Sequence, residues 1–298
     1  MLVLTRDGLP ELYRAASRIS RRGQRRVVQL NLVLILAGLA SGIFALFGGQ
    51  DGPAWHAWAD AMAALWFAVA AVGGAMLNAG RAHRRWFDGR AAAESTKTLT
   101  WKYVMRAEPF EDDSTADALF IERLGEIRPM IHGAGSADGV RGGWLLAPDR
   151  AISPMMRSLR NAEVPDKRAV YRTHRLADQI RWYQDKAAAA DHSSWRWRLA
   201  TIVLGCCGVA GATARAAGWS DLDALGLAAA GLASIAAWTQ LRQYMQNAAA
   251  YRLALRELLV IHENSGRPGY DQVTWGDFCE RAEYAISREH TMWRARAG

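Results

Sequence analysis

The stretch VVQLNLVLILAGLASGIFALF, residues 27–47, decides the fold, because it runs for 21 residues without an Asp, Glu, Lys or Arg. A helix rises about 1.5 Å per residue, so a hydrocarbon core about 30 Å thick needs roughly 17 to 25 apolar residues. This stretch is long enough to cross a membrane as a helix. We predict a transmembrane span at about residues 27–47.

Three further runs lack Asp, Glu, Lys and Arg: residues 61–77, 199–214 and 224–241. Short links join the four runs in pairs, which indicates two helical hairpins. We therefore expect the remaining spans at about residues 61–78, 199–217 and 222–241. The third run is short and ends at Arg215, and the last two are rich in Ala and Gly, which insert weakly. The alternative is a helical hairpin buried in a soluble protein.

The basic residues are sorted around these runs. Residues 1–26 hold seven Arg, and residues 78–106 and 168–198 each hold seven basic residues. The two links, residues 48–60 and 218–223, hold no Lys or Arg, although Asp51, Asp60, Asp221 and Asp223 lie there. By the positive-inside rule, both termini and the middle of the chain are expected in the cytoplasm. This predicts a multi-pass protein of the inner membrane.

The net charge of +8 could indicate nucleic-acid binding. Most of the Arg flank apolar runs, however, where they orient the protein and contact anionic headgroups, so we favour a membrane flank. The three cysteines contain no CxxC pair, and Cys206 and Cys207 are adjacent, which argues against a disulfide framework or a thiolate metal site. The N-terminal region has no convincing cleavage pattern of a secretory signal.

Proline is absent between Pro53 and Pro109 and between Pro165 and Pro268, so these intervals can form long helices. We expect a helix through residues 55–108, an amphipathic helix at 168–198 that runs into the third span, and a helical continuation at 241–263. A Gly/Pro turn at 266–269 precedes a last helix at about 275–293. The predicted fold is an all-α membrane protein with two transmembrane hairpins, four spans in all, and long cytoplasmic helices.

Three regions follow from this pattern: a first unit at 1–110, a connector at 111–165 and a second unit at 166–298. In the connector, Ser114 and Asp117 fit a capping box that opens a helix toward Glu126. Residues 133–143 contain five glycines and are interpreted as a loop. We expect no independent domain in the connector.

No catalytic constellation is present in the sequence. The seven histidines form no HExxH pair, and no serine lies in a GxSxG pattern. The pair His262-Glu263 is interpreted as a solvated pair at a helix end. The prediction is therefore a protein that is not an enzyme, with no catalytic residue, no metal and no cofactor.

Small and polar residues within the runs are more informative. Gly38 and Gly42 form a GxxxG pattern, which serves either oligomer packing or packing within one hairpin. Arg215 either snorkels, pairs with Asp221 or Asp223, or lies at the mouth of a pore. The candidate pore-lining residues are Asn78, Thr213, Arg215, Ser234 and Gln240. The alternative for the uncharged ones is hydrogen bonding to a neighbouring helix.

Several stretches carry a family resemblance. In the first half these are residues 93–97, 100–103 and 106–110, with the sequences AESTK, TWKY and RAEPF. In the second half they are Tyr171, Arg175, residues 178–179, 182–183 and 186–187 before the hairpin, then Trp238, Tyr244, Ala248, Tyr251, residues 257–258, Phe278, Glu283, residues 289–290 and Trp293. On these residues the chain resembles the SLATT superfamily, the two-transmembrane effector domains found beside nucleotide-sensing proteins. Two tandem units resemble two SLATT subtypes.

The resemblance implies a pore-forming effector of bacterial antiphage defence. A partner nucleotidyltransferase, encoded nearby, would make a nucleotide or oligonucleotide signal that gates an oligomeric pore in the lipid bilayer. We expect a homo-oligomer, with a tetramer as the first choice. The candidate ligand-binding residues are basic and aromatic: Arg84, Arg85, Trp86, Arg172, Arg175, Arg181 and Trp182. Headgroup contact and helix packing are the alternatives for each of them.

Two other functions stay open from the sequence. A non-conducting membrane anchor would recruit a partner through the long helices. A soluble helical protein would extract into buffer without detergent.

Overall fold

The computed structural model describes residues 4–48, 55–78, 81–132, 147–219 and 223–297. Throughout these ranges the regular elements are helices, in agreement with the predicted all-α fold. Their order is η1 (Arg6–Gly8), α1 (Glu11–Leu46), α2 (Trp55–Asn78), α3 (Arg81–Met105), α4 (Ala116–His132), α5 (Pro148–Ala151), α6 (Pro154–Arg160), α7 (Val164–Tyr171), η3 (Arg172–Leu176), α8 (Ala177–Ala216), α9 (Ala224–Arg242), α10 (Tyr244–Asn264) and α11 (Gln272–Ala297).

Within the described residues, four helical stretches are long and apolar enough to cross a membrane: Glu11–Ala45, Trp55–Ala75, Val164–Ala216 and Ala224–Asn264. Only 6% to 11% of their most apolar windows is buried by the rest of the chain. A buried hairpin of a soluble protein would have these windows covered, whereas lipid-facing helices leave them exposed. The predicted four-span membrane fold is confirmed, and the buried-hairpin alternative does not fit.

The chain forms two compact units, each of which draws on both halves of the sequence. Unit 1 contains residues 1–24, 81–185 and 251–298, and unit 2 contains residues 25–80 and 186–250. The predicted connector contributes α4 and α6 to unit 1, where both contact α3. The structural division therefore crosses the boundaries of the three predicted regions, because long helices such as α1 and α8 carry the chain from one unit to the other.

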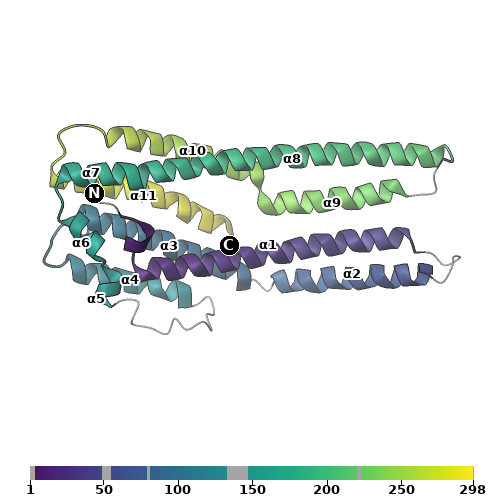
Figure 1. Ribbon diagram of the computed structural model, residues 1–298, viewed down its shortest axis with the longest axis horizontal. Coiled ribbons are helices and arrows are strands. Elements are labelled where there is room, and N and C mark those ends of the chain that lie inside the picture. Colours follow the sequence, from purple (N-terminus) through teal and green to yellow (C-terminus); the bar gives the residue numbers. More distant parts are fainter. Residues whose placement is uncertain (1–3, 49–54, 79–80, 133–146, 220–222, 298) are drawn as a thin grey trace. The chain divides into compact units, whose positions relative to one another are not determined.

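Unit 2 contains the two hairpins, α1 with α2 and α8 with α9 (Figure 1). In the first hairpin, the Ser41 hydroxyl donates to the Ala63 carbonyl at 2.9 Å. In the second, a Cβ added at Gly208 would lie 2.7 Å from the Cβ of Ala228, so the small residues allow close approach of the helices. Large apolar side chains such as Phe67 and Ile202 remain exposed on the outside, at 69% and 63%.

Unit 1 has a conventional buried core. Edge-to-face ring pairs link Trp101 with Tyr171 and Tyr171 with Trp275, at centroid separations of 5.5 and 5.7 Å. A second aromatic group joins Tyr103, Phe110 and Phe120 at the α3–α4 junction. The start of α1 completes this core through Leu12 and Ala16, which are both fully buried. Unit 1 is therefore stabilised by burial of its apolar side chains, whereas unit 2 leaves many of its apolar side chains exposed.

Several helix boundaries differ from prediction. The predicted helix at 55–108 is described as α2 and α3, with residues 79–80 outside the described ranges. The predicted continuation at 241–263 is interrupted at Gln243, which has a left-handed φ of 46° between α9 and α10. The last helix begins at Gln272 rather than near residue 275. The predicted glycine-rich loop at 133–143 and Asp221 lie outside the described residues.

The predicted capping box at Ser114 is wrong. The Ser114 hydroxyl donates to the Asp112 carboxylate at 2.7 Å, in a turn that precedes the start of α4 at Ala116. In that turn the Asp112 carbonyl accepts from the Ala116 amide at 3.0 Å, and its side chain accepts from the Ser114 amide at 2.9 Å. Hydrogen bonds from Ser114 and Thr115 lower the pKa of the Asp112 carboxyl. Both Asp and Ser are good N-caps, so the sequence pattern alone left the start of the helix ambiguous.

Candidate functional site

A cleft of about 320 Å³ lies in unit 1 between η3 and the end of α10. It is lined by Ala169, Arg172, Thr173 and Ala177 on one side and by His262 on the other. The two alanines leave space on either side of Arg172 along the helix. The polar groups available in the cleft are thus a guanidinium, a hydroxyl and an imidazole.

The backbone at the cleft is unusual. Residues 172–176 form a π-helical segment, in which the Ala177 amide donates to the Arg172 carbonyl. Such segments are rare in proteins, and those that are found often lie at functional sites. Here the π turn directs Arg172 and Thr173 to the cleft, while Arg175 and Leu176 are buried in the core of unit 1.

The turn after α10 forms a wall of the same region. Arg168, one turn before Arg172, donates to the Gly266 carbonyl at 2.5 Å and lies over the ring of Tyr270 at 5.9 Å. A Cβ added at Gly266 would lie 3.2 and 3.4 Å from the two terminal nitrogens of Arg172. Arg168 therefore holds the turn against α7. Because Gly266 has no side chain, the Arg172 guanidinium can lie close to the backbone of this turn.

His262 lies close enough to Arg172 to be affected by its charge. Partial burial, and then the positive charge of Arg172, lower the pKa of His262 below its ordinary value. The interpretation of His262 as a solvated pair with Glu263 is corrected, because the imidazole is half-buried and lines the cleft with Arg172. The sequence carried no signal for this pairing, since the two residues are 90 positions apart.

Arg175 does not belong to an accessible site. Its guanidinium and the Glu283 carboxylate have no exposed surface, and the two groups form an ion pair with an Nη2–Oε2 distance of 2.5 Å. The Tyr171 hydroxyl donates to the same carboxylate at 2.9 Å. The sequence-based assignment of Arg175 as a ligand-binding residue is therefore replaced by a role in the core.

The remaining ligand-binding candidates are not brought together. Arg84, Arg85 and Trp86 lie on α3, where Trp86 packs with Phe87 at 5.0 Å and accepts a hydrogen bond from Ser20 through its carbonyl. Arg181 is exposed and pairs with Asp178 on its own helix. Trp182 contacts the ring of Tyr251 at 5.6 Å, and Arg90, which sequence reasoning missed, lies 5.8 Å from its ring.

The pore-lining candidates have local partners. The hydroxyls of Thr213 and Ser234 each donate to a backbone carbonyl one turn earlier, at 2.9 Å. Arg215 and Asp223 form an exposed ion pair at 3.6 Å, one of the pairings considered from the sequence. Gln240 is exposed on α9. Asn78 is the last residue of α2, and its side chain lies outside the part of the chain that the structure describes.

The contacts of the GxxxG pattern match neither alternative fully, because Gly42 in α1 packs against Ala230 in α9 of the other hairpin. A Cβ at Gly42 would lie 3.4 Å from the Cβ of Ala230, so this residue packs within the chain. A Cβ at Gly38 would have nothing within 4 Å. One residue of the pattern is therefore used within the chain, and the other is free for contact outside it.

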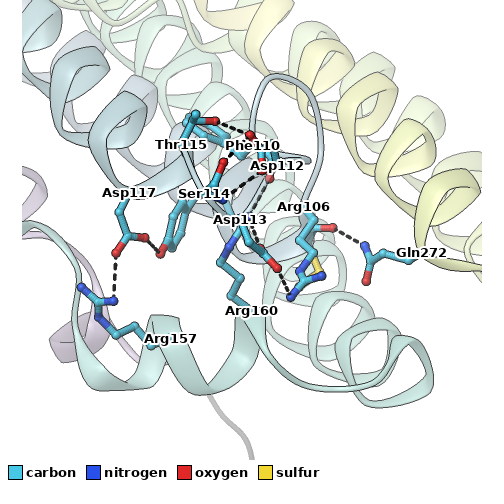
Figure 2. A network of polar contacts seen from close by, with 12 residues as sticks. Arg106, Phe110, Asp112, Asp113, Ser114, Thr115, Asp117, Arg157, Arg160 and Gln272 are labelled. Atoms are coloured by element: carbon cyan, nitrogen blue, oxygen red, sulfur yellow. Dashed lines mark hydrogen bonds and ion pairs between the residues drawn. The ribbon is translucent and has the colours of Figure 1, made fainter.

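A second polar network lies at the α3–α4 junction (Figure 2). Arg160 is 4% exposed and donates to the carbonyls of Tyr103 and Phe110 at 2.6 and 2.8 Å. Its Nη2 also pairs with Asp113 at 2.6 Å, and Asp113 pairs with Arg106 at 2.8 Å. The Arg160 guanidinium donates to protein groups only, so this network has a structural role.

Over the described residues, no group of three or more His, Cys, Asp or Glu side chains could hold a metal ion. The lack of metals and of catalysis stays a prediction.

Family comparisons match nearly the whole chain. The family model of SMODS and SLOG-associating 2TM effector domain 3 matches residues 10–168, and that of domain 1 matches residues 171–293. The chain belongs to the SLATT family. The predicted tandem arrangement of two SLATT units is confirmed, and the first match includes the region predicted as a connector. A search of the curated proteins and of the solved structures gives no match.

SLATT domains are two-transmembrane effector domains associated with defence systems, which agrees with the two apolar hairpins. The Arg172–His262 cleft lies on residues of the second SLATT unit, since both residues fall within 171–293.

Proposed function

We propose that this protein is the membrane effector of a bacterial antiphage defence system. In this proposal it forms an oligomeric pore, with a tetramer as the first choice, that conducts ions across the inner membrane with both termini in the cytoplasm. A nucleotide or oligonucleotide made by a partner nucleotidyltransferase gates the pore. The observation that carries the proposal is the tandem pair of SLATT domains, each with an apolar hairpin left exposed by the chain's own fold.

The polar positions in the spans support a conducting role. Thr213 and Gln240 are exposed on helices whose surroundings are otherwise apolar. An exposed amide such as that of Gln240 is costly against lipid and is better accommodated against water or a second subunit, whereas the Thr213 hydroxyl is already paired with the Val209 carbonyl. In an oligomer these residues would line the conducting path.

Ion flux from liposomes tests the proposal. The purified protein is reconstituted in dye-loaded liposomes, with and without the product of the partner nucleotidyltransferase. Flux that changes with the nucleotide is expected, and no flux under either condition would refute the pore.

Two threonines of α8 provide a matched comparison. Both Thr213 and Thr201 are exposed, and each donates its hydroxyl to a carbonyl one turn earlier. Thr201 lies on another face of α8 from Thr213. Thr213→Val is therefore expected to alter flux, and Thr201→Val is expected to leave flux unchanged. Equal flux in both variants would remove Thr213 from the conducting path.

A non-conducting scaffold is the second candidate. Leu253, Val260 and Val273 are exposed at 58%, 59% and 72% on α10 and α11, outside the predicted spans. Exposed apolar side chains of this size on a cytoplasmic helix are typical of a surface that contacts another protein. Partner binding without flux in the liposome experiment would favour this function.

A further inference from the structure

We propose that the cleft formed by Arg172, Thr173 and His262 binds a phosphate group. For the biological ligand this rests on the proposed function: the phosphate would be that of the signalling nucleotide. The binding chemistry itself stands on the cleft alone.

The charge of the cleft is uncompensated. Within the described part of the chain, the Arg172 side chain has no hydrogen bond or ion pair, although Arg168, one turn away, is engaged at Gly266. A guanidinium presents parallel N–H groups that match two oxygens of a phosphate. The free guanidinium can only donate, the exposed Thr173 hydroxyl and the half-buried His262 imidazole can each donate as well, and a phosphate supplies acceptors for all three.

The repulsion between Arg172 and protonated His262 points the same way. The Arg172 charge contributes to the lowered pKa of His262, so the cleft disfavours a second positive charge when it is empty. An anion placed between the two groups would reverse this effect by favouring the protonated imidazole. A cationic ligand would be repelled by Arg172, and a neutral ligand would lack the charge attraction that an anion gains.

The size of the cleft limits what it can hold. Ligand pockets commonly range from about 300 to 1,000 Å³, so 320 Å³ lies at the lower end. This volume suits a phosphate with its sugar and is too small for a complete oligonucleotide. We infer that the rest of such a ligand would extend out of the cleft, beyond the small side chains of Ala169 and Ala177.

Binding of pyrophosphate to the full chain in detergent tests the site by isothermal titration calorimetry. Arg172→Gln is expected to weaken binding by at least about tenfold, because a hydrogen-bonded charge pair is lost. His262→Gln is expected to weaken it several-fold. Gly266→Ala would place a methyl group against the guanidinium and is also expected to weaken it, while leaving every charge intact.

Arg123→Gln is the matched control, because Arg123 is an exposed arginine of unit 1 that pairs with Glu126 on its own helix. It is expected to bind pyrophosphate within twofold of the wild type. Absence of binding to the folded wild type both with millimolar pyrophosphate and with phosphatidylglycerol nanodiscs would overturn the proposal. Equal binding by Arg172→Gln and Arg123→Gln, both eluting as folded protein, would overturn it too.

Two arms separate the sources of phosphate. Arg172-dependent binding of pyrophosphate in detergent indicates a soluble ligand, whereas Arg172-dependent binding only to nanodiscs of phosphatidylglycerol, relative to phosphatidylcholine, indicates a lipid headgroup. Liposome flux distinguishes this proposal from the pore. Binding without flux refutes only the pore, and nucleotide-dependent flux that is unchanged in Arg172→Gln refutes only the site.

Discussion

Arg175 in η3 donates to both carboxylate oxygens of Glu283 in α11, from Nε to Oε1 at 2.7 Å and from Nη2 to Oε2 at 2.5 Å. Neither side chain has exposed surface, and 108 residues separate them. The Glu283 carboxylate also accepts from Tyr171 and from Thr98, at 2.9 and 3.0 Å. This carboxylate therefore ties η3, α3 and α11 together inside unit 1.

Breaking this pair should strongly destabilise unit 1. Arg175→Met leaves the Glu283 carboxylate buried without a counter-charge, which is expected to cost about 3 to 5 kcal/mol. Thermal unfolding in detergent, followed by circular dichroism, measures the loss. Arg175→Met combined with Glu283→Met should recover much of it, because no buried charge is left unpaired. Arg123→Gln, at an exposed pair, should change stability by less than about 1 kcal/mol. Equal losses in the single and double variants would contradict this account.

The spans could be predicted from sequence because they depend on a local property, the length of an uncharged apolar run. The Arg175–Glu283 pair could not, since it joins two helices that are distant in the chain. In the sequence, Arg175 looks like any other arginine of a basic helix. Only the packing of η3 against α11 separates it from Arg172, which lies three residues earlier and faces the cleft.

The π segment is one reason why the different surroundings of Arg172 and Arg175 could not be predicted from the sequence. A regular amphipathic pattern predicts which residues share a face, but one π turn rotates the faces on either side of it relative to each other. No residue type in the segment 172–176 signals that turn. The site residue His262 was missed for a related reason, because its partner comes from another helix and its sequence neighbour Glu263 suggested a simple surface pair.

Stability should rise with pH above about 8 because of two lysines. Burial, and then the charge of nearby arginines, lowers the pKa of Lys167 and of Lys97 from an ordinary value of 10.5 to about 8. Below about pH 8 both lysines are charged in the folded and the unfolded chain, and they add no pH dependence. Between about pH 8 and 10.5 the unfolded chain binds more protons, so the free energy of unfolding increases with pH.

Melting temperatures in detergent at pH 7.5, 8.5 and 9.5 measure this slope. Lys167→Met and Lys97→Met should each reduce it, and the double variant should remove most of it. Lys186→Met, at an exposed lysine, serves as the control and should keep the wild-type slope. The range stops below pH 10 because burial raises the pKa of Tyr103 and Tyr171, whose retained protons would lower stability at higher pH. Burial also raises the pKa of the Cys279 thiol above 9.0, so this one group opposes the two lysines near pH 9 without reversing the slope. A wild-type melting temperature that falls from pH 7.5 to 9.5 would contradict the prediction.

Arg160 should be required for an ordered α3–α4 junction. Arg160→Gln removes the donors to the Tyr103 and Phe110 carbonyls, and it leaves those groups and Asp113 without this partner (Figure 2). Loss of donors to buried carbonyls costs about 1 to 3 kcal/mol each, so a loss of at least about 2 kcal/mol is expected. Limited proteolysis should then cut residues 106–115 faster. The control is Arg157→Gln, at an exposed arginine that pairs with Asp117. Equal cleavage rates in the two variants would show that Arg160 does not hold the junction.

The crossing of α1 and α3 should depend on two glycines. A Cβ at Gly23 would lie 2.7 Å from the Trp86 amide nitrogen, and a Cβ at Gly89 would lie 2.7 Å from the Ser20 amide nitrogen. Both contacts are with backbone, so the helices must separate to admit a methyl group. Overpacking of this kind costs about 1 to 3 kcal/mol, against a gain of about 1 kcal/mol in helix propensity.

We therefore expect Gly23→Ala and Gly89→Ala each to lower stability by up to about 2 kcal/mol. The pair together should lower it by less than the sum, since the first substitution already separates the helices. Gly74→Ala is the matched control, because a Cβ there has nothing within 4 Å and only the propensity gain remains. Thermal unfolding in detergent again provides the measurement. If Gly23→Ala melted as high as Gly74→Ala, the close approach of α1 to Trp86 would not exist in the folded protein.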